Sequence, residues 1–335
     1  MKNYILLISA FFTLQIQAQD LIYSQFNAMP LALNPAFAGN NSCNYRFSAI
    51  GRSQWSGINN VKSYQSATLA GDVNINNNID DQINLWGAGA MLSYDKASVG
   101  SFTNLMMVGN LAYHIRFGKE ANNFLSLGIQ AGAGQRGVNA SSLVFGDQLD
   151  DFGRFVGGTK ETITNESKWY PELGFGALLT LNPNDNSNMY FGSSILHLLN
   201  PNVSFTNDEY KLPVRFNFHA GGNFLHGNYV FLPSVYVQYQ QLANYNIGTY
   251  AGTYLSAGSE TTDPTIGYLG LWYKSQDAIA AALRLDIGKM SLAFSYDIHT
   301  GGVARNLNAI GSPELSINYY GCFQRDTRRS GCPRL

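Results

Sequence analysis

The sequence contains few charged residues, and this scarcity narrows the classes of protein that it can encode. Only 13% of its 335 residues are charged, and the formal net charge is -1. A near-neutral chain lacks the basic surface that nucleic-acid binding requires, so no nucleic-acid partner is predicted. A soluble β-sandwich is also disfavoured, because the polar faces of its strands normally carry many lysines and glutamates.

Long apolar runs are missing as well. The apolar stretch at residues 4–14 is shorter than the roughly 20 residues that a membrane-spanning helix needs. Lys2 precedes this stretch and Gln17-Ala18-Gln19 follows it, which is the pattern of a cleaved export signal at residues 1–19. We expect the mature chain to begin near Gln19 or Asp20, and any insertion into a membrane to rely on strands.

Patterns of catalytic or metal-binding residues are absent too. The five histidines, at positions 114, 197, 219, 226 and 299, form no pair with metal-ligand spacing. Residues 132–137 match a dinucleotide fingerprint, but no helix is predicted after them to hold a pyrophosphate. The acidic residues Asp147, Asp150 and Asp151 are better explained by a solvated loop than by a calcium site. No enzymatic activity, cofactor or metal is predicted.

What the sequence does contain is a repeated alternation of apolar residues with polar or small ones. In residues 279–287 the odd positions are Ile, Ala or Leu, while the even positions are Ala, Arg and Asp. After the turn Gly288-Lys289, residues 290–298 repeat the pattern. Because side chains of a strand alternate between its faces, each segment has one apolar and one wetter face. Such segments, separated by Gly, Asn and Asp turns, are typical of a transmembrane antiparallel β-barrel whose apolar faces meet lipid.

We predict about 14 strands, with 12 or 16 as alternatives. The long connections 135–167, 200–211 and 299–312 all follow odd-numbered strands, as expected when both ends of the barrel chain are periplasmic. The eleventh strand fits this rule least well, because a longer connection precedes it than follows it. The predicted strands cover residues 43–55, 61–75, 83–95, 101–117, 123–134, 168–181, 188–199, 212–225, 229–240, 244–256, 264–273, 277–287, 289–298 and 313–323.

The rest of the chain divides around this barrel at residues 43–323. Residues 20–42 are expected to form an N-terminal periplasmic cap or plug segment, and residues 324–335 an arginine-rich periplasmic tail. The tail carries Arg325, Arg328 and Arg329, and its alternative interpretation is a solvated end. The pattern gives no boundary inside the barrel, so a single domain is predicted.

The cysteines number only three: Cys43, Cys322 and Cys332. An exported chain can keep disulfides. Cys43 and Cys322 become neighbours when the first and last strands pair, whereas Cys322 and Cys332 are joined by a short stretch of tail. The sequence leaves both pairings open.

The segment before the first strand combines aromatic residues and prolines without strand alternation. Proline fixes φ and lacks a backbone donor, so a shaped, irregular segment is predicted, with a loosely ordered terminus as the alternative. Together with polar and aromatic residues early in the barrel, it supplies the candidate plug and partner-binding residues. These are Tyr23, Gln25, Phe26, Pro30, Asn34, Pro35, Gly39, Arg46, Gln54 and Trp55.

These residues carry a family resemblance. Gln25-Phe26, the run from Asn34 to Gly39, Arg46 and Gln54-Trp55, in this order after an export signal, resemble the PorP/SprF family of type IX secretion outer-membrane proteins. The resemblance continues along the chain through Leu212-Pro213, Gly221-Gly222, Leu232-Pro233-Ser234, Gly270-Leu271-Trp272-Tyr273, Ser295-Tyr296-Asp297 and Pro313-Glu314-Leu315.

The resemblance implies a non-enzymatic role in the outer membrane of a Gram-negative cell. Family members support secretion and surface anchoring of large adhesins and gliding-motility proteins. The expected partners are a secreted adhesin with a C-terminal secretion domain, periplasmic components of the same machinery, and outer-membrane lipid. Because barrels of this size also carry solutes, a porin or hydrophobic-solute channel is the alternative.

Overall fold

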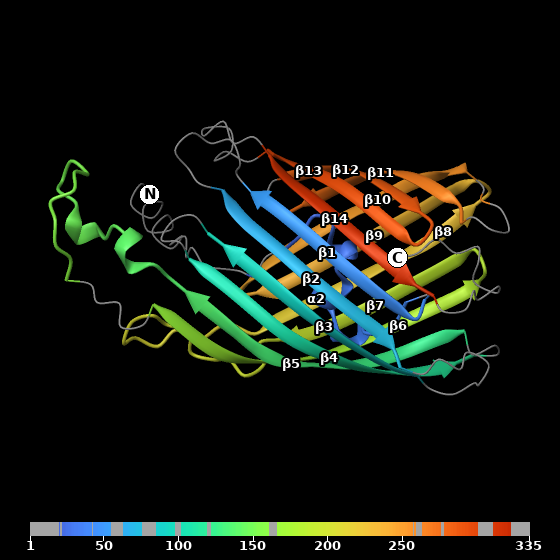
Figure 1. Cartoon of the computed structure of the whole chain (residues 1–335), viewed down its shortest axis with the longest axis horizontal. Coiled ribbons are helices and arrows are strands. Elements are labelled where there is room, and N and C mark those ends of the chain that lie inside the picture. Colours follow the sequence, from blue (N-terminus) through green and yellow to red (C-terminus); the bar gives the residue numbers. More distant parts are fainter. Residues whose placement is uncertain are drawn as a thin grey trace, which may run out of the picture.

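The fold is a closed barrel of fourteen antiparallel strands (Figure 1). The computed structural model describes residues 20, 22–41, 43–54, 63–75, 85–97, 102–118, 122–160, 166–256, 258, 263–275, 278–300 and 311–322. Each strand pairs with its sequence neighbours, and β1 closes the barrel by pairing with β14. The predicted fold class is thereby confirmed. The strands are β1 (Tyr45–Gln54), β2 (Tyr64–Asn74), β3 (Leu85–Lys96), β4 (Thr103–Phe117), β5 (Asn123–Gly137), β6 (Ser167–Asn184), β7 (Ser187–Leu196), β8 (Arg215–His226), β9 (Tyr229–Gln240), β10 (Leu242–Ser256), β11 (Thr265–Lys274), β12 (Ala278–Ile287), β13 (Met290–His299) and β14 (Ser312–Gly321).

Two of the larger differences from the predicted boundaries lie between β7 and β8. The strand predicted to reach residue 199 ends at Leu196, because His197 and Asn200 adopt left-handed backbone conformations with φ of 57° and 48°. These conformations turn the chain out of the sheet. The next strand begins at Arg215 instead of residue 212, because Leu212 is buried in a cluster with Val203 and with Tyr170 of β6.

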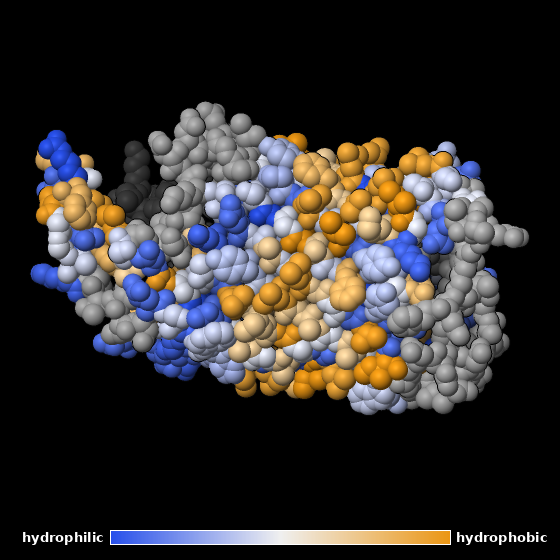
Figure 2. Space-filling model, in the orientation of Figure 1, coloured by the Kyte–Doolittle hydropathy of each residue, from blue (hydrophilic) through white to orange (hydrophobic). Residues whose placement is uncertain are grey.

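The two faces of the wall differ as the alternation predicts. Leu283 and Phe294 are exposed on the outside, whereas Ser295 and Asp297, on alternate positions, are wholly buried on the inside. Apolar residues form a broad band on the face shown in Figure 2. Exposed aromatic residues flank the band at both ends of the strands, as in the aromatic girdles of membrane barrels. They are Tyr94, Trp169, Tyr239, Tyr245 and Tyr273 at one end, and Trp86, Phe117, Tyr229 and Tyr319 at the other.

The two ends of the barrel differ in their connections. The loop end carries the connections that follow odd-numbered strands, including 138–166, 197–214 and 300–311. The hairpin end carries the two-residue turns 185–186, 227–228 and 288–289. The three longest connections all lie at the loop end, as predicted. The division is not complete, because the connections 75–84 and 257–264 at the hairpin end are longer than the single residue, Gln241, that joins β9 to β10 at the loop end. No helix among the described residues is both long and apolar enough to cross a membrane.

The N-terminal segment, residues 22–41, lies inside the barrel. It forms three short turns of helix: η2 (Phe26–Ala28), α2 (Pro30–Leu33) and η3 (Pro35–Phe37). Pro30 and Pro35 each occupy a first helical position, where the missing N–H costs nothing. The apolar core is the interface between this segment and the inward side chains of the wall, where Phe26, Leu31 and Phe37 are buried. We call residues 22–41 the plug.

A disulfide between Cys43 and Cys322 joins the two ends of the barrel chain at the hairpin end. The Cα atoms are 4.6 Å apart, and 279 residues separate the cysteines in sequence. The bridge therefore lies beside the seam at which β1 pairs with β14, and it is one of the two pairings that the sequence left open. Cys332 lies outside the described residues.

Candidate functional site

The plug passes closest to the wall along Asn34–Gly39, near the hairpin end. There it lies on wall glycines whose missing side chains make room for its backbone. A Cβ atom at Gly87 of β3 would collide with the Ala38 carbonyl, and one at Gly128 of β5 would collide with the backbone of Ala36. Glycine permits this approach because it has no Cβ. The close packing gives a physical reason for the sequence Asn-Pro-Ala-Phe-Ala-Gly.

Asn34 fixes the plug to two wall strands through hydrogen bonds. Its side-chain amide donates to the carbonyl oxygens of Ala177 on β6 and Ser193 on β7, at 2.9 and 3.0 Å. Its Oδ1 accepts a 2.9 Å bond from the backbone N–H of Ala36 and caps η3. Nε2 of His219 lies 3.1 Å from the Asn34 amide. Asn34 is wholly buried, so each of these bonds offsets the cost of removing a polar group from water.

A buried ion pair holds the hairpin end of the plug. Arg46 Nε donates to Asp72 Oδ1 at 2.9 Å, and an Arg46 guanidinium nitrogen, Nη2, lies 3.3 Å from the Phe37 carbonyl oxygen. Asp72 Oδ2 also accepts the backbone N–H of Gly39 at 2.9 Å. The φ of Gly39 is 69°, a conformation that favours glycine. The pair from β1 and β2 therefore binds the plug backbone directly.

A first charged cluster, which we call the seam latch, holds the plug at the loop end. The hydroxyl of Ser24 donates to Asp297 Oδ1 at 2.5 Å, and the backbone N–H groups of Ser24 and Gln25 donate to the two oxygens of Glu314 at 2.8 and 3.0 Å. Arg52 Nη2 and Lys274 Nζ lie 3.0 and 2.9 Å from Asp297 Oδ2. Two cations and two carboxylates thus balance within a site that excludes water, as buried charges require.

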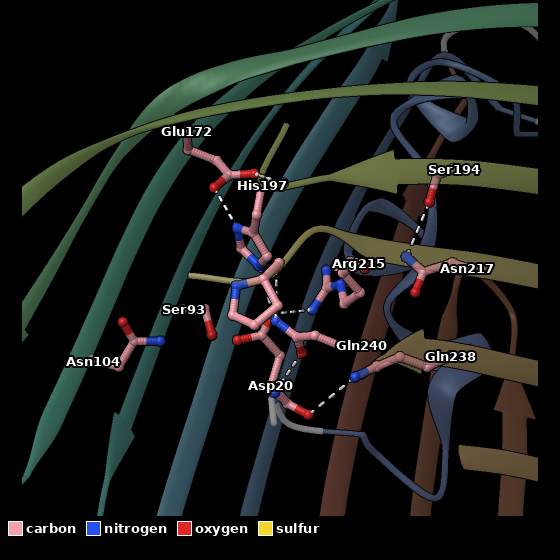
Figure 3. Close-up of polar contacts among 12 residues, drawn as sticks. Asp20, Ser93, Asn104, Glu172, Ser194, His197, Arg215, Asn217, Gln238 and Gln240 are labelled. Atoms are coloured by element: carbon pink, nitrogen blue, oxygen red, sulfur yellow. Dashed lines mark hydrogen bonds and ion pairs between the residues drawn. The ribbon is translucent and has the colours of Figure 1, made fainter. Parts of the chain in front are cut away.

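A second cluster, the histidine latch, lies on the other side of the loop end (Figure 3). The His197 ring bridges two carboxylates: Nδ1 lies 2.5 Å from Glu172 Oε2, and Nε2 lies 2.5 Å from Asp20 Oδ2. Arg215 Nη1 lies 3.0 Å from the same Asp20 oxygen. Asp20 also bonds the barrel through its backbone N–H, which donates to Gln240 Oε1 at 3.1 Å.

Opposing effects set the ionisation of the histidine latch. Burial alone would lower the pKa of His197, but the carboxylates of Asp20 and Glu172 raise it to about 9. Burial alone would raise the pKa of Asp20, but His197 and Arg215 bring it well below its usual value. At neutral pH the imidazolium therefore joins two carboxylates and a guanidinium in a balanced set.

The lumen holds a small cavity beside the plug. A cavity of about 50 Å³ lies between the histidine latch and β2–β4, lined by residues that include Thr68, Met91, Asp95 and Asn104. This volume suits a few water molecules at most. Across the described residues, no group of three or more His, Cys, Asp or Glu side chains is arranged so that it could hold a metal ion.

The residues singled out in the sequence are mostly buried in this assembly. The hydroxyl oxygens of Tyr23 and Thr68 are 2.8 Å apart, and the ring of Phe26 packs on Tyr236 with centroids 5.5 Å apart. Gln25 Nε2 donates to Ser295 Oγ at 2.9 Å. Gln54 is only the last residue of β1, at the loop end and half-buried. Trp55, Arg325, Arg328 and Arg329 lie outside the described residues, as does the predicted export signal.

The wall residues of the two latches were not among the site residues predicted from the sequence, although Gln25 of the plug was. Arg52, Lys274, Asp297 and Glu314 come from four strands, and each sits on an inward position of its strand. The alternation alone marks them as inward charges that need partners in the lumen. His197 carried no such signal, because it lies in a loop just past β7.

Residues 138–160, which follow β5 and which we call the arm, project from the loop end beyond the strands and are drawn in green in Figure 1. The arm contains η5 (Ala140–Ser142), η6 (Gly146–Gln148) and an antiparallel bridge between Leu149 and Phe155. Phe152 is 82% exposed and Phe155 65% exposed. The other strongly exposed apolar side chains of the arm are Val144, Leu149 and Val156.

The carboxylates of the arm hold the arm itself together. Asp147 accepts the backbone N–H of Lys160 and the hydroxyl of Thr159, and these bonds hold the pKa of Asp147 below its usual value. Asp150 Oδ1 accepts the backbone N–H groups of Phe152 and Arg154 at 2.9 and 2.8 Å. The hydrogen bonds of Asp147 and Asp150 therefore order the arm, while its apolar side chains, such as Phe152, are exposed to solvent.

A lipid-facing barrel with an internal plug defines the class: an outer-membrane β-barrel protein. The sequence comparison then identifies the family. Residues 15–319 match the family described as type IX secretion system membrane protein PorP/SprF, and the chain belongs to it. Membership implies association with components of that secretion system. No curated protein matches the sequence.

Several solved outer-membrane proteins are similar in architecture. The CymD monoaromatic hydrocarbon channel has a TM-score of 0.49 and 10% identity, with 90% of this chain and 95% of that chain covered. A Pseudomonas aeruginosa FadL homologue has a TM-score of 0.47 and 10% identity, with 85% of this chain and 92% of that chain covered. The Pseudomonas putida toluene transporter TodX has a TM-score of 0.46 and 9% identity, with 87% of this chain and 93% of that chain covered.

Proposed function

We propose that this protein supports secretion of a large adhesin or gliding-motility protein and anchors it at the cell surface. In this proposal the chain is exported through a cleaved signal at residues 1–19, and the loop end faces outward. The arm binds the C-terminal secretion domain of the adhesin. The arginine-rich tail at 324–335 faces periplasmic components of the secretion system.

The observation that carries the proposal is an apolar arm beyond a barrel whose lumen is filled. Exposed side chains such as Phe152 and Phe155 cost free energy in water and are typical of surfaces that bind protein. The latches, the Asn34 contacts and the glycine packing hold the plug at both ends of the lumen. These contacts favour a docking role over a porin or hydrophobic-solute channel.

The test changes the arm without touching the barrel. We expect the double variant Phe152→Asp, Phe155→Asp to release the adhesin into the medium while the amount of folded barrel stays the same. Asp151→Asn, one residue from Phe152, is the matched control and should retain the adhesin. The amount of adhesin in the surface fraction and in the medium is compared by mass spectrometry. Folding of the barrel is followed by its heat-modifiable mobility in gels. Full retention of the adhesin by the double variant would reject the docking role of the arm.

A second measurement separates docking from transport. Purified protein in a planar bilayer should show almost no ion conductance, because the plug occupies the lumen. Steady conductance of the wild-type protein would support the channel instead.

A further inference from the structure

The outer wall of the barrel carries an apolar groove close to the hairpin end. Its volume is about 730 Å³, and it crosses the wall from β9 to β14. Two rows of outward residues border it. The row nearer the middle of the barrel is Phe231, Ala251, Leu269, Leu283, Phe294 and Leu315, and the row nearer the hairpin end is Tyr229, Thr253, Gly267, Leu285 and Leu292.

Small residues create the groove. Ala251 and Gly267 leave gaps in the two rows because they are small, whereas the neighbouring Leu269 is 68% exposed and projects from the wall. Gly267 faces outward, where its nearest neighbour is the flexible end of Leu255. Because this surface faces the hydrocarbon layer, its occupant has to be apolar, and a flexible chain fills such a groove without leaving voids.

Charges of both signs lie at the hairpin end of the groove. Lys289 is exposed in the turn that follows β12, roughly 13 Å along the strand from Leu285. Asp263 lies beside the neighbouring Gly288: its carboxylate oxygen is 3.7 Å from where a Gly288 Cβ would be. A cation and an anion at one turn complement a headgroup that carries both a phosphate and an amine.

We propose that this groove binds one phospholipid, with an acyl chain between β9 and β14 and a zwitterionic ethanolamine headgroup at Lys289 and Asp263. The choice of phospholipid rests on the proposed orientation, in which the hairpin end faces the periplasm. The binding site itself is independent of the arm and of any secreted partner.

The test uses purified full-length protein and native mass spectrometry during graded removal of lipid. Gly267→Leu fills the groove, and Gly109→Leu is the matched control, because Gly109 is an outward wall glycine with open space around it. Wild type and Gly109→Leu should retain one phosphatidylethanolamine, and Gly267→Leu should lose it at least fivefold more readily. Equal retention by all three proteins, or none by the wild type, would overturn the proposal.

Two further variants and a second lipid make the test specific for this groove and this headgroup. Ala251→Leu fills the same groove from another strand. It replaces Gly267→Leu in the test if Gly267→Leu does not fold, as judged by its heat-modifiable mobility in gels. Lys289→Glu should weaken retention of phosphatidylethanolamine while leaving the barrel folded. Preferential retention of lipopolysaccharide over phosphatidylethanolamine by the wild type would reject the headgroup assignment. These lipid measurements do not depend on the adhesin assay, so either proposal can fail alone.

Discussion

Gly87 on β3 lies so close to the carbonyl group of Ala38 in the plug that a side chain of any size would displace one of them. Comparable contacts at Gly128 and Gly176 place wall glycines under Ala36 and Asn34. The plug motif and the wall glycines are therefore a matched pair. A change on either side has the same physical consequence, which is loss of this close approach.

The first prediction concerns this contact. Gly87→Ala should destabilise the barrel by about 1–3 kcal/mol, the usual cost of overpacking a tightly filled interior. Gly109→Ala is the control, because its Cβ would point outward and meet nothing closer than 3.9 Å. The measurement is the temperature of heat-modified mobility in gels. An unchanged temperature for Gly87→Ala would show that the plug shifts without cost.

The second prediction concerns the seam latch. Asp297→Asn leaves Arg52 and Lys274 without the carboxylate that both approach, and should cost about 3–5 kcal/mol. Lys274→Met removes one cation and keeps the pair between Arg52 and Asp297, so its effect should be clearly smaller. Unfolding midpoints in denaturant rank the two variants. Equal midpoints would mean that Asp297 does not neutralise the cluster.

The third prediction concerns pH and the histidine latch. Because folding raises the pKa of His197 to about 9, its stabilisation is complete below the unfolded pKa of about 6.5 and is lost as pH rises through 9. The loss should amount to roughly 3 kcal/mol. Thermal midpoints of wild type should fall between about pH 6.5 and 9.5, whereas those of His197→Gln should be nearly flat. A parallel fall in both proteins would assign the pH dependence to groups outside the histidine latch.

The fourth prediction concerns the bridge at the seam. Cys43→Ser and Cys322→Ser should each lower the unfolding midpoint by about the same amount, because each removes the same cross-link. The double variant should match either single variant. A larger loss in the double variant would mean that one of the cysteines stabilises the barrel in another way, and Cys332→Ser tests whether the tail thiol takes part.

The alternation of residues was enough to predict the barrel, because lipid on one face and a packed lumen on the other impose the same two-residue period on every strand. The boundaries at β7 and β8 were not predictable. His197 is held by Glu172 of β6 and by Asp20, and Leu212 is buried against Tyr170 of β6, so both boundaries depend on contacts that no local pattern reveals.

The plug was visible in the sequence as an irregular segment, but its course was not. Residues 22–41 run through the lumen from the seam latch at the loop end to Asp72 near the hairpin end. The latches bring together residues from strands far apart in sequence, and no local pattern marks which inward charges will meet. Arg46 was identified in the motif, whereas its partner Asp72 was not.

The bond between Gln25 and Glu314 spans 289 residues, so the earliest and the latest parts of the barrel chain meet in one contact. Most loop-closure entropy must be lost before such a contact forms. The plug is synthesised before any strand, but this bond can form only once β14 has joined the wall. Seating of the plug and sealing of the cylinder are then a single late event in biogenesis.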